Sequence, residues 1–278
     1  MKLRYVVAVS GGVDSVVLLD MLSKNSTHEI VVAHFDHGIR EDSAEDAAFV
    51  SELAEAYGHA FETLREELGA NVSEEKARDR RYLFLRSIAK KYDGQIVTAH
   101  HADDIVETIA INFTRGTGWR GLAVLDSDIH RPLLHLSKSD ILKYAADYNL
   151  SWREDSTNAS DAYLRNRLRR KAIHLDPDMK RELLALRSQQ VESKRLIKEA
   201  VTELIGEGPE YSRYFFTHAP AKVAIECLRA VTHARLTRPQ LERVLLAIKT
   251  AAPKSSYTAG SGITFDFTTR NFSLSLLK

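Results

Sequence analysis

Short apolar runs alternate with amphipathic stretches through the first half of the chain. The apolar runs are brief and rich in β-branched residues, which is typical of buried parallel strands, and they predict strands at residues 5–9, 30–35, 60–64 and 96–99. Between them, apolar positions recur at helical spacing and predict helices at residues 14–22, 43–57, 71–92 and 102–113. Strand alternating with helix predicts an α/β fold, in which a Rossmann-like parallel sheet carries helices on both faces.

Two of these helices have recognisable starts. Ser43 followed by Asp46 has the spacing of a capping box, in which the side chains at the start of a helix bind its free backbone N–H groups. Asn71 followed by Glu74 has the same spacing. We therefore expect Ser43 and Asn71 to open the second and third helices.

The pattern changes after Arg115. A helix at residues 137–148 and a polar loop at 151–161 precede a long charged helix at 177–205. Glycine and proline interrupt the chain at residues 206–209, and a helix at 237–251 and alternating strands at 263–267 and 272–276 follow. These breaks predict a larger domain at residues 1–176, a helical linker at 177–208 and a small α+β domain at 209–278.

Composition narrows the class of protein. Of the 278 residues, 44% are hydrophobic and 28% are charged, which argues against a disordered or fibrous chain. The lone cysteine, Cys227, excludes a disulfide within the chain and a four-thiolate zinc site. Because 39 basic residues nearly cancel 38 acidic ones, binding to nucleic acid would need a local patch. No apolar run approaches the ~18 residues of a membrane span, so we expect a cytoplasmic protein without a membrane partner.

The strongest chemical signal is a glycine-containing loop between the first predicted strand and helix. Glycines let backbone N–H groups approach an anion, and the helix N-terminus adds partial positive charge, so the loop predicts phosphate binding. Asp14 would repel phosphate unless Mg²⁺ lay between them, which makes Asp14 the candidate metal contact. A Walker-type loop would need a lysine that is absent here, and the plain alternative is an ordinary strand-to-helix turn. The candidate phosphate-binding residues are Ser10, Gly11, Gly12, Val13, Asp14 and Ser15.

A second glycine motif, at residues 116–121, fits the dinucleotide pattern G-x-G-x-x-G. That pattern requires a strand before it and a helix after it. Here a predicted helix precedes it and nothing strongly helical follows, so we reject dinucleotide binding. We expect a flexible substrate loop that carries Arg115 and Arg120.

Histidines and acidic residues follow the second and fourth predicted strands, at residues 34–40 and 100–104. Ligands of open α/β sheets gather at the carboxyl ends of the strands, so both clusters should lie beside the glycine loop. They could ligate metals for hydrolysis, or they could position a magnesium nucleotide and an amine nucleophile. We expect His101 only to cap a helix or satisfy backbone groups.

Basic residues crowd the predicted helix that contains Arg78 and Arg81, and a second cluster contains Arg165 and Arg169. Such runs are usually solvated faces. Two of them in a nearly neutral chain also suit a surface that follows phosphates.

Several motifs in order resemble one family. The loop at residues 10–15 resembles the ATP-pyrophosphatase loop family. Together with residues 34–40, 77–85, 99–108, 115–122, 131–134 and 154–166, the chain looks like the tRNA(Ile)-lysidine synthases of that family. The resemblance runs from about residue 5 to residue 171 and is weaker beyond residue 210. Longer members carry a further C-terminal domain, for which this chain is too short.

The resemblance implies a ligase. ATP would adenylate O2 of the wobble cytidine in tRNA(Ile) with a CAU anticodon, and the ε-amine of free L-lysine would then attack C2 and release AMP. The product, lysidine, would switch decoding to AUA. Residues 1–176 would form the catalytic domain and 209–278 a tRNA-binding domain, and a homodimer is a further expectation. Catalytic candidates are Asp36, His37, Asp103, Asp104, Glu107 and Arg115, with the base unassigned. Candidate tRNA contacts are Arg78, Arg81, Arg165 and Arg169.

Other functions compete with this one. An ATP-dependent tRNA thiolase of the same loop family would typically use paired cysteines, and the chain has only Cys227. A metal-dependent phosphoesterase could use the His and Asp clusters without ATP, and a non-catalytic nucleotide-sensing or RNA-binding module is a third possibility. Pyrophosphate exchange distinguishes them.

Overall fold

The computed structural model describes residues 3–24, 27–38, 43–69, 72–153, 175–206 and 208–276. Two compact units make up the chain: unit 1 is Met1–Gln190 and unit 2 is Val191–Lys278. Their limit falls inside the long helix α7, Pro177–Ile205, whose predicted extent is confirmed. The three segments expected from the sequence, with a separate linker at 177–208, stay a prediction.

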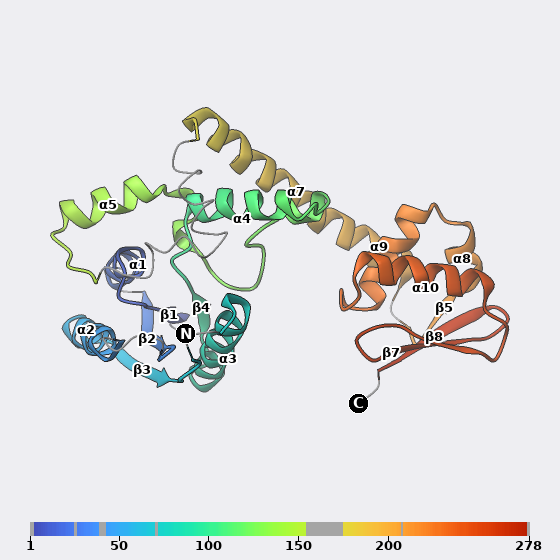
Figure 1. The fold of residues 1–278 in the computed structure, drawn as a ribbon, viewed down its shortest axis with the longest axis horizontal. Helices are drawn as coiled ribbons and strands as arrows, with labels where there is room; N and C mark the ends of the chain where they lie inside the picture. Colours follow the sequence, from blue (N-terminus) through green and yellow to red (C-terminus); the bar gives the residue numbers. More distant parts are fainter. Residues whose placement is uncertain are drawn as a thin grey trace. The chain divides into compact units, whose positions relative to one another are not determined.

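A four-stranded parallel sheet forms the centre of unit 1 (Figure 1). Its strands are β1 (Leu3–Ala8), β2 (His28–Asp36), β3 (Ala60–Arg65) and β4 (Gln95–Val97), in the order β3-β2-β1-β4. In the register, Val7 lies between Val32 and Val97. The outer side of β4 also carries a single bridge from Val97 to His130. The predicted parallel α/β sheet is therefore confirmed.

Helices cover both faces of this sheet, because alternate strand residues belong to different cores. Val7 and Val32 pack with α1 (Val13–Ser23), α2 (Ser43–Ala56) and α5 (Lys138–Asp147). Val6 and Val31 pack with α3 (Glu74–Tyr92) on the other face. A smaller cluster joins α4 (Ala102–Thr114) to the start of α7 and to two short 3₁₀ helices, η1 (Trp119–Leu122) and η2 (Pro132–His135).

Two local expectations need correction, and a third agrees with the structure. Ser43 is already the first residue of α2, and its hydroxyl donates to Asp36 Oδ2 at 3.1 Å instead of capping the helix. Helix α3 is capped by Ser73, whose side chain accepts the N–H of Lys76 at 3.2 Å; Asn71 lies outside the described residues. The glycine motif at 116–121 follows α4, as expected, and the only helical element next to it in the described residues is the four-residue 3₁₀ helix η1, which begins inside the motif.

Unit 2 is an α+β unit, as predicted. Its antiparallel sheet has the order β5-β8-β7-β6, where the strands are β5 (Glu210–Ser212), β6 (Ser256–Thr258), β7 (Ile263–Phe267) and β8 (Asn271–Leu276). Helices α8 (Arg213–His218), α9 (Ala221–Val231) and α10 (Arg238–Thr250) complete it. Phe216, Phe265 and Phe272 are almost fully buried at its centre. The sequence missed β5, β6, α8 and α9.

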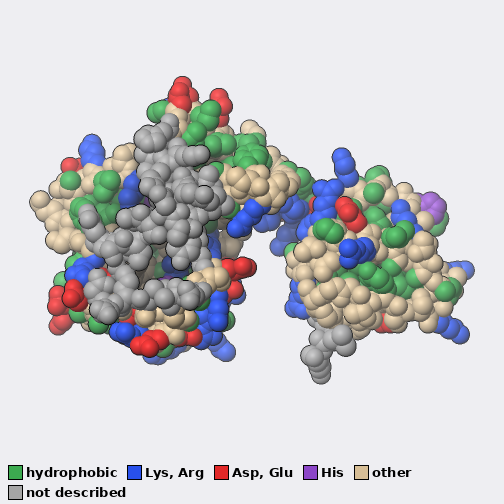
Figure 2. All heavy atoms as spheres, viewed as in Figure 1, with side chains coloured by type: hydrophobic (Ala, Val, Ile, Leu, Met, Phe, Trp, Pro, Cys, Tyr) green, Lys and Arg blue, Asp and Glu red, His purple; other side chains and the backbone are tan. Residues whose placement is uncertain are grey.

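Charged side chains of both signs are interspersed over the face of unit 1 drawn in Figure 2, in keeping with the near-zero net charge. The helices that the structure describes include none with the length and apolar character needed to cross a membrane.

Candidate functional site at the carboxyl edge of the parallel sheet

The glycine loop between β1 and α1 is held in shape by its own serines. Buried Ser15 donates its hydroxyl to Gly12 O at 2.9 Å and accepts the N–H of Ser10 at 3.2 Å. Gly11 has φ of +92°, a conformation that L side chains rarely adopt. The N-cap of α1 is Gly12, which has no side chain to bind the first free amides of the helix. The loop is therefore preformed, with helix amides available to an anion.

A residue far along the chain ties this loop to α2. Arg153 donates its backbone N–H to Gly11 O at 3.0 Å. Its side chain reaches Asp46 Oδ1 at 2.9 Å and Glu45 Oε2 at 2.8 Å. Sequence reasoning missed Arg153, because only the fold brings it to the loop.

Two lysines bind the aspartates at the mouth of the loop. Lys138 Nζ lies 2.5 Å from Asp14 Oδ1, and the backbone N–H of Lys138 donates to Asp103 Oδ2 at 2.7 Å. Lys180, at the start of α7, donates to Asp103 Oδ1 at 2.8 Å. Although burial opposes the charged form, Lys180 and the Lys138 amide hold the pKa of Asp103 below its ordinary value. Neither lysine was predicted.

The start of α4 brings more of the predicted residues to this place. His101 is the N-cap of α4, as expected, and its N–H donates to Asp104 Oδ2 at 2.9 Å. His101 Nε2 also lies 3.8 Å from Asp14 Oδ2, which joins the start of α4 to the loop. Asp104 and Glu107 are both buried. Asp14, Asp103 and Asp104 thus surround one histidine, and Glu107 lies one turn further along α4.

Asp36 and His37, after β2, make other contacts. Asp36 is buried and accepts the N–H of Gly38 at 2.8 Å, in addition to the Ser43 hydroxyl. Burial, and then the charge of Arg81, lower the pKa of His37, whose ring packs edge-on against Phe35. Within the described residues, no hydrogen bond or ion pair joins Asp36 or His37 to the aspartates around His101.

His100 is held neutral. Burial lowers its pKa to about 3, and the charges of Arg131, Arg81 and Arg78 act in the same direction against the opposing charge of Asp104. Its Nδ1 lies 2.8 Å from Thr98 Oγ1. An imidazole in this setting can donate or accept one hydrogen bond at each nitrogen, but it carries no charge at neutral pH.

The remaining predicted residues lie apart from the aspartates around His101 or outside the described chain. Arg115 is the exposed C-cap residue of α4. Arg78 and Arg81 lie on α3, with their guanidinium groups 5.2 Å and 5.5 Å from the ring centre of Tyr82. Arg165 and Arg169 are outside the described residues.

The carboxylates and histidines of this site do not form a metal-binding site by themselves. In the part of the chain that the structure describes, no three His, Cys, Asp or Glu side chains are grouped to hold a metal ion. Mg²⁺, however, commonly binds one or two carboxylates together with substrate phosphates. Asp14 fits such a bridging role, and an ion there would compete with the Lys138 ammonium.

Comparisons with known proteins show which sequences and folds this chain resembles. A tRNA(Ile)-lysidine synthase from Bacillus cereus is 39% identical over 221 residues, covering 71% of this chain and 46% of the relative. One from Persephonella marina is 34% identical over 200 residues, covering 66% and 44%. The chain spans about half the length of these curated relatives.

Solved structures support the fold. A U34-tRNA thiolase from Methanococcus maripaludis matches 69% of this chain and 73% of its own with a TM-score of 0.58, at 17% identity. The profile of the PP-loop domain matches residues 1–175, which contain the whole parallel sheet and the preformed loop at residues 10–15. The chain therefore belongs to the PP-loop domain family.

Proposed function

We propose that this chain is an ATP-dependent ligase that attaches lysine to the wobble cytidine of a CAU-anticodon tRNA(Ile). The observation that carries the proposal is the 39% identity to a tRNA(Ile)-lysidine synthase over 221 residues. The PP-loop domain match at residues 1–175 includes the loop and the acidic cluster at the start of α4. The thiolase shares the fold at 17% identity and gives no support for sulfur transfer here.

The glycine loop would bind the ATP phosphates. Its amides and the N-terminus of α1 supply hydrogen bonds and partial positive charge, and Lys138 beside Asp14 adds a full positive charge. Mg²⁺ at Asp14 would screen the charge of the phosphates. Cytidine O2 attacks the α-phosphorus, pyrophosphate leaves, and the oxygen becomes part of a good leaving group.

The acidic residues at the start of α4 would receive lysine. Asp14 and Asp103 already hold the ammonium groups of Lys138 and Lys180, so carboxylates here can bind a cationic amine. Buried Asp104 and Glu107 are further candidates. The lysine ε-amine must lose a proton before it attacks C2 and displaces AMP, and one of these carboxylates is proposed to accept it.

The test is direct. The chain is incubated with ATP, isotopically labelled lysine and CAU-anticodon tRNA, and the tRNA is analysed by mass spectrometry. We expect one lysine per tRNA at the wobble position and release of pyrophosphate and AMP. A matched tRNA whose anticodon lacks the wobble cytidine should gain nothing. If ammonia or glutamine serves as well as lysine, the proposed second substrate is wrong.

A further inference from the structure

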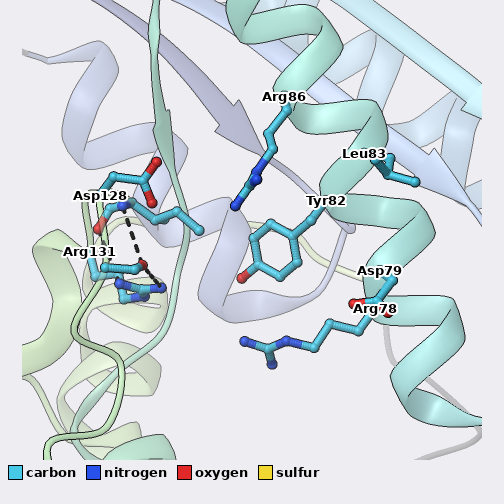
Figure 3. Close-up of a pocket in the computed structure, with 9 residues that line it drawn as sticks. Arg78, Asp79, Tyr82, Leu83, Arg86, Asp128 and Arg131 are labelled. Atoms are coloured by element: carbon cyan, nitrogen blue, oxygen red, sulfur yellow. Dashed lines mark hydrogen bonds between the residues drawn. The ribbon is translucent and has the colours of Figure 1, made fainter. Parts of the chain in front are cut away.

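A pocket of about 490 Å³ lies between α3 and residues 127–131 (Figure 3). This volume falls in the range of about 300–1,000 Å³ that is usual for ligand pockets. None of its lining residues belongs to the glycine loop at residues 10–15. Its wall at Arg78 and Arg131 is close enough to His100 to lower the pKa of that histidine.

Positive charge predominates in the pocket. Arg78, Arg86 and Arg131 line it against the two carboxylates of Asp79 and Asp128. The side chains of Arg78 and Arg86 extend from α3 toward the wall that carries Arg131 (Figure 3). Within the described chain, no carboxylate pairs with any of the three guanidinium groups. The pocket therefore has three guanidinium groups against two carboxylates in its lining.

Arg131 is the buried member of this set, with 8% of its surface exposed. It donates to Leu125 O at 3.0 Å, Ile129 O at 3.1 Å and Ser127 Oγ at 3.0 Å, all of which are neutral acceptors. Burial lowers its pKa. A buried guanidinium without a counter-charge is costly, and an anion in the pocket would offset that cost.

Tyr82 offers a ligand in the pocket both a hydroxyl group and an aromatic ring. Its hydroxyl and Arg131 Nε are buried, and neither makes a hydrogen bond of regular geometry to any residue that the structure describes, although the Tyr82 side chain and the Arg131 guanidinium interact with each other. The ring of Tyr82 lies beneath Arg78. A phosphate oxygen could accept from both donors, since planar guanidinium groups match phosphate geometry.

We propose that this pocket binds a phosphate group of an RNA strand. A phosphate group of ATP would suit the pocket as well as one of RNA. The loop at residues 10–15, however, already offers the amides that the phosphates of a nucleotide need. The rim favours a polymer, because Arg86 is exposed and Leu83 is 58% exposed, so a bound strand can continue past α3. Only the choice of RNA rests on the proposed function.

The experiment measures the affinity of an anticodon stem–loop RNA for the full chain across a salt series. The variant is Arg86→Gln, whose exposed position spares the fold. The matched control is Arg80→Gln on the same helix, where the arginine is exposed, pairs with Glu66 at 2.9 Å and does not line the pocket. We expect Arg86→Gln to weaken binding and to reduce the slope of log affinity against log salt by about 0.7–0.9, the value for one phosphate contact. The control should keep the slope of the unaltered chain.

Separate arms titrate the same proteins with ATP and with inorganic pyrophosphate. A loss of ATP or pyrophosphate affinity in Arg86→Gln with unchanged RNA affinity would assign the pocket to the nucleotide and overturn the proposal. Equal salt slopes for the two variants would overturn it too. Lysine transfer by the unaltered chain tests the proposed function independently, because these arms measure binding alone.

Discussion

At the scale of single residues, the loop at residues 10–15 depends on backbone conformation as much as on side chains. Gly11 and Gly12 are neighbours whose backbones adopt different conformations. Gly11 has φ of +92°, whereas Gly12 has φ of −73° and lies in the extended region that any residue can adopt. A Cβ at Gly11 would meet Val50, Phe49 and Arg153 only at ordinary contact distances of 3.5–3.8 Å. The constraint at Gly11 is therefore its backbone angle, not space.

We expect Gly11→Ala to lower the free energy of unfolding of unit 1 by about 1–3 kcal/mol, the cost of a strained backbone. Gly12→Ala should change it far less, because its Cβ would meet only Ser10 Oγ at 3.6 Å. Denaturant unfolding of both variants measures the difference. Equal losses would show that the positive φ is not the constraint.

His100 gives a pH prediction. Its ordinary pKa is 6.5, and burial lowers it to about 3 in the folded chain. Between these values the unfolded chain binds a proton that the folded chain does not, so stability falls as pH is lowered below about 6.5. We expect His100→Gln to flatten the fall in melting temperature between about pH 7 and pH 5. Part of the dependence of melting temperature on pH should remain, because burial also lowers the pKa values of His37 and His59. A slope as steep as that of the unaltered chain would contradict this assignment.

Which site residues the sequence could reveal follows from their distance along the chain. Asp14, Asp103 and Asp104 were predictable, because they begin helices that follow strands, and the carboxyl ends of these strands meet at one edge of a parallel sheet. Lys138 lies 124 residues from its partner Asp14, and Lys180 lies 77 residues from Asp103. A surface lysine has no local signal that distinguishes it, so only the packing of α5 and α7 reveals these pairs.

At the scale of elements, the start of α5 is part of the site. Ser137 caps this helix, and its side chain accepts the N–H of Asp140 while the Asp140 carboxylate accepts the N–H of Ser137. Lys138 is the next residue, and it contacts both Asp14 and Asp103. The cap therefore fixes a side chain and an amide that the loop uses.

We expect Ser137→Ala to destabilise unit 1 by about 0.5–2 kcal/mol and also to weaken ATP binding. The control is Thr237→Ala, which removes the hydroxyl of the N-cap residue of α10 in unit 2, where it donates to Gln240 Oε1 at 2.8 Å. It should cost unit 2 similar stability and leave ATP affinity unchanged. Calorimetric titration measures the ATP affinity of both variants. Equal ATP affinities would show that the cap at Ser137 does not contribute to the ATP site.

Elements were predictable where periodicity ran long enough. The strands of unit 1 were found as short apolar runs, and the 29-residue α7 was found as a long charged stretch with few helix breakers. The three-residue strands β5 and β6 were missed because they lack an apolar run like the one that revealed the equally short β4. The six-residue α8 is too short to show a helical period. The capping role given to Ser43 failed for another reason: its hydroxyl binds Asp36, at the end of the preceding strand β2.

At the scale of the whole chain, the two units have separate hydrophobic cores, and each unit contains a side chain that can report its own unfolding. Both tryptophans, Trp119 and Trp152, belong to unit 1. The single cysteine, Cys227, is fully buried in the core of unit 2, where burial raises the pKa of its thiol to about 11. A protonated, buried thiol is unreactive, so it reports unfolding of its own unit.

We expect ATP at 100 times its dissociation constant to stabilise the transition reported by tryptophan fluorescence by about 2.7 kcal/mol. Labelling of Cys227 by a thiol reagent in denaturant should keep its midpoint, because unit 2 contributes no residue to the loop at residues 10–15. Parallel denaturant series with and without ATP make the measurement. Equal shifts in both signals would mean that the units unfold as one.

The bridge at the edge of β4 has a consequence for motion. His130 donates its N–H to Ile96 O at 2.9 Å and accepts the N–H of Thr98 at 3.0 Å. These backbone hydrogen bonds join the pocket wall that carries Arg131 to strand β4. This wall can move away only when those ladder bonds break, which makes it part of a cooperative, slowly exchanging region. Amide hydrogens of His130 and Thr98 should therefore exchange with solvent on the timescale of the central strands. A recess with such a wall is already ordered before any ligand arrives, and binding there loses little conformational entropy.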